Sequence, residues 1–169
     1  MMKGVLMERL WAPWRLQYVG AEKPAGCVFC DKPLQGDDRA AYIVKRGTHA
    51  YVILNAFPYN NGHLLVTPYA HISALEDVPS QTLYEMMDLA QLCARALKEA
   101  FHADALNAGF NLGAAAGAGI ADHLHMHIVP RWAGDTNFMP VLGDVRIIPQ
   151  SLDDAYCILT EAFAQMEAG

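Results

Sequence analysis

The sequence predicts a single α+β domain, with an antiparallel sheet, a long helix packed on it and a C-terminal helix. Three apolar runs, at residues 41–44, 50–54 and 63–67, follow one another with short connections, as antiparallel strands do. Residues 80–101 then carry apolar side chains at three- and four-residue spacing over about five turns. The 169-residue chain shows no internal repeat and no domain boundary, so one domain is expected.

Turn-forming residues separate the first three strands. The break at residues 46–48 predicts a β-hairpin between the first two runs. Residues 57–62 contain Pro, Asn and Gly and are predicted to form a loop before the third strand, which Pro68 ends. Pro79 and Ser80 then mark the expected start of the long helix.

Two more strands and a helix are expected in the second half of the chain. Residues 108–112 and 124–129 are the strand candidates, and the small-residue loop 113–119 connects them. Near the C-terminus, Ser151 and Asp154 stand three positions apart, which resembles a capping box and predicts a helix that follows it.

The composition indicates a folded, acidic protein. Hydrophobic residues make up 53% of the chain and charged residues 18%, a balance that argues against a disordered or linker-dominated protein. The formal net charge of -6 argues against general electrostatic binding of nucleic acid. No window approaches about 18 consecutive apolar residues, and residues 1–10 lack a signal-peptide core. We therefore expect a cytoplasmic protein without membrane or nucleic-acid partners.

Residues 123–129 read His-Leu-His-Met-His-Ile-Val and carry the strongest functional signal. In an extended strand, alternation places the three imidazoles on one face and the apolar side chains on the core face. Buried imidazoles without partners are costly, so a metal, an anion or catalysis explains the pattern better than a half-exposed strand. The histidines are His123, His125 and His127, and the apolar residues are Leu124, Met126 and Ile128.

Two chemistries are compatible with these histidines. In one, a His-x-His pair binds a catalytic metal whose bound water hydrolyses the substrate. In the other, a neutral imidazole attacks phosphorus directly while its neighbours neutralise phosphate charge. The upstream loop holds Gly113, Gly117 and Gly119, and its backbone N–H groups can approach phosphate oxygens closely. The loop favours phosphate chemistry, although such loops are often only flexible connections.

Cys27 and Cys30 form a CxxC pair, whereas Cys93 and Cys157 stand alone as small residues of helical patterns. Four cysteines are too few for a disulfide scaffold in a chain of this length. Two thiolates at this spacing suit one tetrahedral metal ion, while an unliganded thiol pair and a redox pair remain alternatives. A thioredoxin-like role is disfavoured because no βαβ pattern follows.

The segment 123–129 resembles the His-φ-His-φ-His-φ-φ signature of the histidine triad (HIT) nucleotidyl hydrolases and transferases, where φ is apolar. The CxxC pair, residues 61–68 and residues 71–72 occur in the order and approximate spacing of HIT domains. The resemblance implies an HIT-like fold with residues 1–26 as an irregular N-terminal arm, 27–132 as the core and 133–169 as a C-terminal extension with a helix. The flanks, at residues 10–15 and 130–140, resemble bacterial diadenosine tetraphosphate phosphorylases of the Fhit-like branch.

The resemblance assigns roles to individual residues. His125 corresponds to the nucleophile that attacks the α-phosphorus and forms a covalent nucleotidyl-histidine intermediate. His127 corresponds to the histidine that contacts the phosphate and the leaving oxygen. His63 matches a phosphate-side histidine, although a solvent-facing side chain is the alternative. Asn55 matches a ribose-binding position and Asn111 a phosphate-side position, and each is also compatible with a turn.

The resemblance also implies a structural zinc ion. HIT members with a CxxC pair complete the site with the histidine of a Pro-x-x-His segment and with the first histidine of the triad. In this sequence the four ligands are therefore Cys27, Cys30, His71 and His123. If zinc binds His123, His125 is free for catalysis. The alternative of a catalytic metal is then disfavoured, because it needs a His-x-His pair of ligands on the strand.

The expected activity is cleavage of dinucleoside polyphosphates such as diadenosine tetraphosphate at the α-phosphate, by phosphorolysis or hydrolysis. The alternatives are a nucleoside phosphoramidate hydrolase and a nucleotide-binding module with weak turnover. Gly117 and Gly119 are the expected backbone contacts to the substrate phosphates, and the family resemblance implies a homodimer. Trp11, Trp14 and Trp132 either stack on a base or pack the arm against the sheet.

Overall fold

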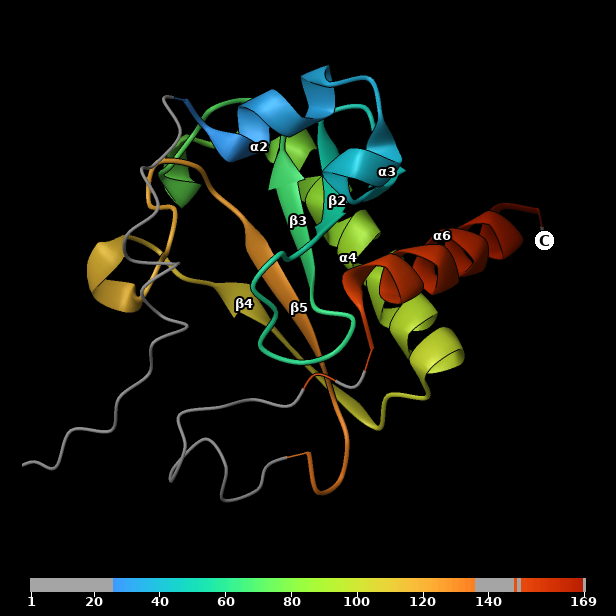
Figure 1. Cartoon of the computed structure of the whole chain (residues 1–169). Helices are drawn as coiled ribbons and strands as arrows, with labels where there is room; N and C mark the ends of the chain where they lie inside the picture. The colour runs from blue at the N-terminus through green and yellow to red at the C-terminus, as the bar shows by residue number, and fades with distance from the viewer. Residues whose placement is uncertain (1–25, 136–147, 149, 169) are drawn as a thin grey trace, which may run out of the picture.

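The computed structural model describes residues 26–135, 148 and 150–168 (Figure 1). It contains one five-stranded sheet with the order β1-β2-β3-β5-β4, and every neighbouring pair is antiparallel. This confirms the predicted α+β class with an antiparallel sheet. The predictions for Trp11, Trp14, the N-terminal arm and residues 136–140 lie outside the described residues. The strands are β1 Ile43–Arg46, β2 Ala50–Leu54, β3 Leu64–Pro68, β4 Ala105–Phe110 and β5 Met126–Arg131.

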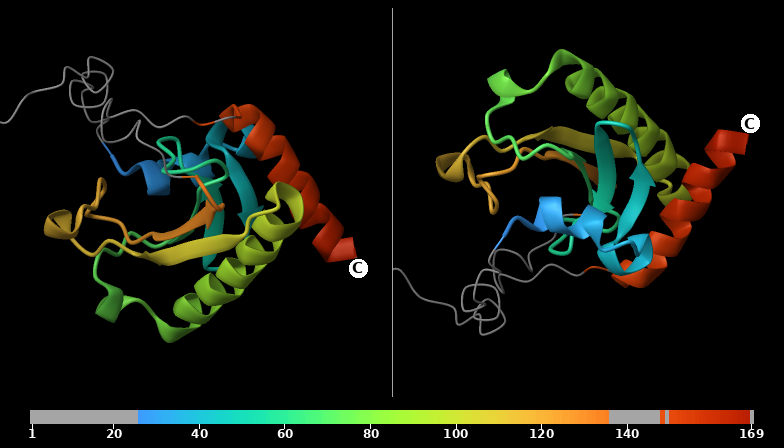
Figure 2. Two further views of the ribbon diagram at one scale, coloured as in Figure 1. Left: turned by 90° about the horizontal axis from the view of Figure 1, so that it is seen from below. Right: turned by 90° about the horizontal axis from the view of Figure 1, so that it is seen from above.

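Two long helices cover one face of the sheet, and short helices cover the other (Figure 2). Helix α4 packs against β2 and β3, and α6 packs against α4 and β1. No helix among the described residues is both long and apolar enough to cross a membrane. The helices and turns are α2 Val28–Asp31, η1 Lys32–Leu34, α3 Asp38–Ala41, η2 Leu75–Asp77, α4 Ser80–Phe101, η3 Ala114–Ala116 and α6 Leu152–Ala168.

Alternation along the central strands builds a separate core on each face of the sheet. Val52 of β2 and Val66 of β3 belong to the larger cluster beneath α4 and α6. Tyr51, Ile53 and Leu65 point to the opposite face, where they form a smaller cluster with residues of α2 and α3. Because side chains alternate along a strand, each strand contributes to both cores and becomes buried on both faces.

The predicted strand boundaries are partly wrong. The first strand begins at Ile43 rather than at residue 41, because α3 extends to Ala41 and Tyr42 then adopts a left-handed conformation with φ 60°. The fourth strand runs from 105 to 110 rather than from 108 to 112. Local patterns define strand ends poorly because the end depends on where the pairing partner stops.

The last strand begins at Met126 rather than at residue 124. Leu124 directs its backbone groups outside the ladder: its N–H donates to the Ile72 carbonyl at 2.7 Å, and its carbonyl accepts from Thr67 Oγ1 at 2.9 Å. Of the three histidines, only His127 therefore lies within the paired strand.

Two polar contacts stabilise the helical layer. The predicted cap of α6 is present, because Ser151 Oγ accepts from the Asp154 backbone N–H at 3.1 Å and donates to Asp154 Oδ2 at 2.7 Å. On α4, the carboxylate of Glu85 accepts backbone N–H groups from the β1–β2 turn, at 2.6 Å from Thr48 and at 3.1 Å from Ala50. The contacts of Glu85 attach the β1–β2 hairpin to α4.

Candidate functional site

The three histidines are all buried, with exposed fractions of 1% for His123, 7% for His125 and 9% for His127. The apolar residues between them, Leu124, Met126 and Ile128, belong to the large core cluster on the opposite side. The predicted alternation is therefore confirmed. It sets three imidazoles on the side of the sheet that faces α2.

The hydrogen bond of His125 defines which of its nitrogens is free. Nδ1 lies 2.8 Å from the backbone carbonyl oxygen of His123, and a carbonyl can only accept, so Nδ1–H is the donor. Burial lowers the pKa of His125, which favours the neutral ring. In that neutral ring, Nε2 carries an unshared electron pair. His125 therefore has the protonation state that a nucleophile requires.

A relay of hydrogen bonds defines the protonation of the other two imidazoles. The backbone N–H of Tyr59 donates to Nδ1 of His63 at 3.0 Å, so the neutral His63 ring carries its proton on Nε2. That Nε2–H donates to Nδ1 of His127 at 3.0 Å. The neutral His127 ring then holds its own proton on Nε2. Burial lowers the pKa of His63 to about 3 and that of His127 to about 4, so both rings are neutral near pH 7.

Two predicted asparagines lie beside this relay. Nδ2 of Asn55 donates to Nδ1 of His63 at 3.3 Å. Nδ2 of Asn111 lies 3.4 Å from Nε2 of His127, but both atoms carry hydrogen in the assigned tautomer, so this contact is not a hydrogen bond. Asn55 also has the alternative turn role, because its Oδ1 accepts from the Phe57 backbone N–H at 2.9 Å. His63 has an exposed fraction of 0%, which excludes the solvent-facing alternative.

The two predicted glycines lie in an exposed loop that precedes β5. Gly117, with φ 89°, ends the short η3 turn, and Gly119 follows in the same exposed loop. Among the described residues, no hydrogen bond links either glycine to the three histidines. Their contact with phosphate remains a prediction about the substrate-bound protein.

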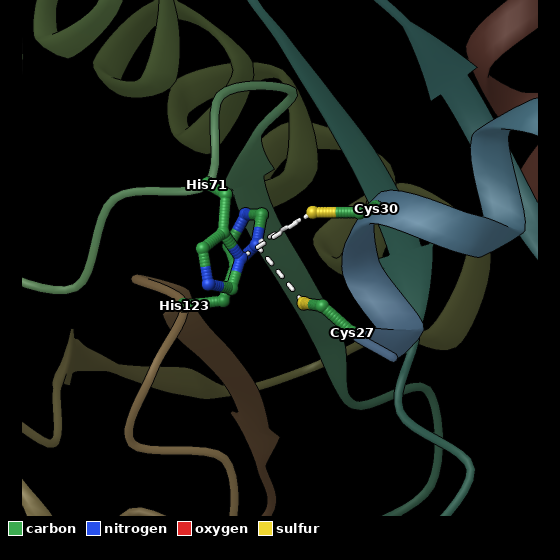
Figure 3. Close-up of side chains that lie close together, drawn as sticks. All are labelled: Cys27, Cys30, His71 and His123. Carbon is green, nitrogen blue, oxygen red and sulfur yellow. Dashed lines mark hydrogen bonds between the residues drawn. The ribbon is translucent and has the colours of Figure 1, made fainter. Parts of the chain in front are cut away.

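The predicted metal ligands converge from distant parts of the chain (Figure 3). Nδ1 of His123 lies 3.2 Å from Cys27 Sγ and 3.5 Å from Cys30 Sγ, and Nδ1 of His71 lies 3.4 Å from Cys30 Sγ. The four ligand atoms all lie within 4.8 Å of one another. Cys27 caps α2 and Cys30 lies within it, so one helical turn presents both sulfurs.

The donor set of this cluster fits zinc. Two thiolates and two imidazole nitrogens form a closed tetrahedral Cys₂His₂ set, which is typical of structural zinc. The Nε2–H of His123 donates to the Pro68 carbonyl at 2.9 Å, so its unshared pair lies on Nδ1 and faces the sulfurs. A backbone carbonyl in this role orients metal-binding histidines in other proteins.

Sequence reasoning missed two aromatic residues that contact the imidazoles. The ring of Phe29 lies 5.3 Å from that of His123 and 4.9 Å from that of His125, between ring centroids. The ring of Tyr59 stacks on His127 at 5.4 Å and contacts His63 at 4.7 Å. The only sequence signals were an apolar residue inside the CxxC and an aromatic residue just before the Asn-Asn-Gly turn.

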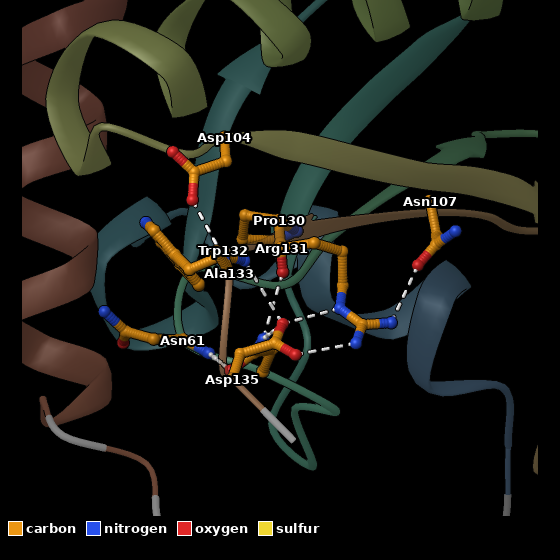
Figure 4. A network of polar contacts seen from close by, with 9 residues as sticks. Asn61, Asp104, Asn107, Pro130, Arg131, Trp132, Ala133 and Asp135 are labelled. Carbon is orange, nitrogen blue, oxygen red and sulfur yellow. Dashed lines mark hydrogen bonds and ion pairs between the residues drawn. The ribbon is translucent and has the colours of Figure 1, made fainter.

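A polar network around Arg131 and Asp135 (Figure 4) also fixes the loop that carries Tyr59. Asn60 Nδ2 donates to the Pro130 carbonyl at 3.1 Å and to Asp135 Oδ2 at 2.9 Å. Arg131 forms a two-pronged ion pair with Asp135, at 2.6 and 2.7 Å. The loop is thereby attached to the end of β5, which holds Tyr59 against His63 and His127.

Trp132 belongs to the framework of the domain. Its indole N–H donates to the carbonyls of Phe101 at 3.2 Å and His102 at 3.1 Å, at the C-terminal end of α4. The contact attaches the end of β5 to the end of α4, whereas the predicted packing of Trp132 against the arm involves residues outside the described ranges.

Comparisons with known proteins agree with this geometry. Residues 38–134 match the HIT domain family. The chain is 38% identical to the AP-4-A phosphorylase of Mycobacterium tuberculosis, covering 94% of this chain and 86% of that protein. It resembles a zinc-bound histidine triad family protein from Mycobacterium smegmatis with a TM-score of 0.69 and 32% identity, over 85% of this chain and 96% of the other. A histidine triad nucleotide-binding protein from Sulfolobus tokodaii gives a TM-score of 0.66 at 28% identity, over 83% and 94% of the two chains.

Proposed function

The chain belongs to the HIT domain family, and we propose that it is a nucleotidyl transferase or hydrolase that cleaves dinucleoside polyphosphates such as diadenosine tetraphosphate. The observation that carries the proposal is the hydrogen bond from His125 Nδ1–H to the His123 carbonyl. It leaves a buried, unprotonated Nε2 on the side of the sheet that holds the other histidines. The similarity to a phosphorylase of diadenosine tetraphosphate supports the same substrate class.

The proposed reaction has two displacements at phosphorus. In the first, the unshared pair on His125 Nε2 forms a bond to the α-phosphorus, and the bond to the leaving phosphate oxygen breaks with its electron pair. In the second, water or inorganic phosphate attacks the same phosphorus, and the P–N bond breaks, which restores the neutral imidazole. Two in-line displacements give retention at phosphorus.

His127 is the proposed partner of the leaving oxygen. Its neutral ring carries the proton on Nε2, because His63 donates to its Nδ1. A hydrogen-bond donor at this position stabilises the negative charge that develops on the leaving oxygen. We assign substrate contacts to His63, Asn55 and Asn111, as the family resemblance implies. Gly117 and Gly119 are added because their small-residue loop lets backbone N–H groups approach phosphate oxygens.

Cys27, Cys30, His71 and His123 are the proposed ligands of a structural zinc ion. The convergence of four suitable donors and the zinc-bound relative from Mycobacterium smegmatis support this assignment. Zinc would fix α2 to the segment that precedes β5. None of the four cysteines forms a disulfide bond. The cytoplasm, where thiols stay reduced, is the proposed location.

A homodimer through β4 is the proposed assembly. The strand Ala105–Phe110 contains no charged residue and lies at the end of the described sheet. Leu106 is opposite Pro130 in the β4–β5 ladder. Pro130 has no N–H to donate, and its carbonyl accepts from Asn60, so Leu106 and Pro130 form a pair that is not hydrogen-bonded. Hydrogen-bonded and non-hydrogen-bonded pairs alternate along an antiparallel ladder. The backbone N–H and C=O groups of Leu106, Ala108 and Phe110 therefore point away from β5, to the open edge. Such an edge can pair with a second copy.

Product analysis tests the proposed function. Diadenosine tetraphosphate is incubated with the protein, with and without inorganic phosphate, and the nucleotides are separated. Phosphorolysis yields ADP and ATP, hydrolysis yields AMP and ATP, and either result supports the proposal. Binding without conversion favours the nucleotide-binding alternative. Turnover of a nucleoside phosphoramidate but not of the dinucleotide favours the phosphoramidate hydrolase.

The variant His125→Ala tests the nucleophile. We expect it to bind the substrate and to lose turnover, because no other imidazole nitrogen has the same position and protonation. Mass spectrometry of wild-type protein denatured during turnover at alkaline pH, where the P–N bond is stable, should detect the nucleotidyl adduct on the peptide that contains His125. Turnover by His125→Ala, or an adduct on another residue, would refute the mechanism.

A further inference from the structure

We propose that Asp135 is a positioning residue for the imidazole relay, because through Asn60 it holds the loop whose backbone decides which nitrogen of His63 carries the proton. The inference rests on the proposed function, in which the relay presents the Nε2–H of His127 to the leaving oxygen. It gives a carboxylate just beyond the end of β5 a role in catalysis that acts through the histidines.

The backbone of the loop 57–60 determines the tautomer of His63. The N–H of Tyr59 donates to Nδ1 of His63 at 3.0 Å. The N–H of Phe57 donates to Oδ1 of Asn55 at 2.9 Å, which turns Nδ2 of Asn55 toward the same Nδ1, at 3.3 Å. Two donors at Nδ1 exclude a proton there, so the neutral ring carries its proton on Nε2. Both donors depend on where this loop lies.

His63 transmits this preference to His127. Its Nε2–H donates to Nδ1 of His127 at 3.0 Å, so the hydrogen of the neutral His127 ring lies on Nε2. The ring of Tyr59 stacks on the ring of His127, with 5.4 Å between centroids and an interplanar angle of 14°. The proposed donor to the leaving oxygen therefore depends on the loop twice, through the backbone of Tyr59 and through its ring.

The side chain of Asn60 attaches this loop to the end of β5. Its Nδ2 donates to the Pro130 carbonyl at 3.1 Å and to Asp135 Oδ2 at 2.9 Å, which uses both hydrogens of the amide nitrogen. Its Oδ1 accepts from the Asn61 backbone N–H at 3.1 Å. Asn60 directly follows Tyr59, so the anchored side chain fixes the residue whose N–H and ring contact the histidines.

The carboxylate of Asp135 is itself held in place. Its side chain has an exposed fraction of 10%, and Arg131 donates to Oδ2 from Nε at 2.6 Å and to Oδ1 from Nη2 at 2.7 Å. The backbone N–H of Trp132 also donates to Oδ2, at 3.2 Å. Arg131 is held in turn by Asn107 of β4, whose Oδ1 accepts from Nη1 at 3.0 Å. Because charged acceptors form stronger hydrogen bonds than neutral ones, Asp135 is a firm anchor for Asn60.

Loss of this anchor should lower turnover more than it weakens substrate binding. Without Asp135 the loop can shift, and Nδ1 of His63 then carries the proton in a part of the molecules. In that part, Nε2 of His127 no longer carries a hydrogen and cannot donate to the leaving oxygen. Removal of one donor to a developing negative charge costs on the order of 100-fold in kcat. Since the donor is lost only in part, we expect Asp135→Ala to lower kcat by roughly 10-fold, with a smaller change in KM.

The test compares Asp135→Ala, Asn60→Ala and the double variant with Asp104→Ala. Asp104 Oδ2 accepts from the Ala133 N–H at 2.8 Å, so it holds the same turn from its other side and controls for loosening of that turn (Figure 4). Asn60→Ala breaks the contact from the loop side and decides the question if Asp135→Ala folds poorly. The measurements are kcat and KM for diadenosine tetraphosphate and long-range ¹H–¹⁵N NMR of the histidine rings without ligand.

The proposal predicts Nε2–H tautomers for His63 and His127 in the wild type and in Asp104→Ala. Asp135→Ala and Asn60→Ala should each show tautomer mixtures at both rings and a lower kcat. The double variant should be no worse than either single variant, because both substitutions remove the same contact.

Wild-type tautomers at His63 and His127 in the two single variants overturn the inference, and so does an unchanged kcat where the tautomers shift. Additive losses in the double variant, or equal defects in Asp104→Ala, also overturn it. If the wild type lacks turnover, the proposed function fails, and the ligand-free NMR spectra still decide whether Asp135 sets the two tautomers.

Discussion

Acidification should destabilise this protein strongly, because two of its buried imidazoles stay neutral in the fold. The ordinary histidine pKa of 6.5 falls to about 3 in His63 and to about 4 in His127, mainly through burial. The groups that face His63 are the rings of His127 and Tyr59 and the amide of Asn55. Among these contacts there is no carboxylate to stabilise an imidazolium ion.

The sign and size of the effect follow from proton linkage. Below pH 6.5 the unfolded chain binds protons that the folded protein excludes, so stability is complete above that pH and declines as the pH falls toward the folded-state values. At about pH 5, one such histidine costs about 2 kcal/mol relative to neutral pH, and His63 and His127 together cost about 4 kcal/mol. That is a large fraction of the stability of an ordinary domain.

The assay is equilibrium unfolding in urea at about pH 7.5 and about pH 5, for the wild type and His127→Asn. The variant removes one titrating ring, so its loss of stability on acidification should be smaller than that of the wild type by about 2 kcal/mol. His102→Asn is the matched control, because His102 is exposed at the left-handed end of α4, where Asn is also accepted. If the wild type and His127→Asn lose equal stability on acidification, the assigned cause is wrong.

Three further variants test the metal cluster, the assembly and the hairpin. Cys27→Ser should reduce zinc from about one ion per chain to well below it and lower the melting temperature, as measured by elemental analysis and calorimetry. Ala108→Pro removes an outward N–H of β4 without disturbing the β4–β5 ladder, and should convert a dimer to a monomer in analytical ultracentrifugation. Glu85→Gln weakens the acceptor for the β1–β2 turn and should cost about 1–3 kcal/mol in urea unfolding.

Each of these variants has a matched control. Cys157→Ser changes an exposed thiol outside the cluster and should retain zinc. Ala108→Val keeps the backbone N–H, so it should leave the assembly intact, and a dimeric Ala108→Pro would refute pairing through β4. Glu99→Gln changes an exposed carboxylate of the same helix as Glu85. Equal stability losses in the two variants would show that the hydrogen bonds from the β1–β2 turn to Glu85 do not stabilise the fold.

The local pattern of the sequence determined much of the fold. The apolar spacing of residues 80–101 predicted α4 within one residue, because a helix that buries one face needs that spacing. Ser151 and Asp154 predicted the start of α6, since a cap involves residues only three positions apart. The alternation of residues 123–129 predicted which side chains enter the core. These features are local, so a short stretch of sequence contains all the information they require.

The tertiary structure alone decided how the parts of the site meet. His63 and His127 are 64 positions apart, and they meet because β3 pairs with β5, with Leu65 opposite His127. Cys27 and His123 are 96 positions apart, and only the family resemblance related them beforehand. The contact of Phe29 with His125 had only a weak signal in the sequence, an apolar residue inside the CxxC. Strand order and register set such contacts, and they result from the packing of the whole chain, which no local pattern specifies.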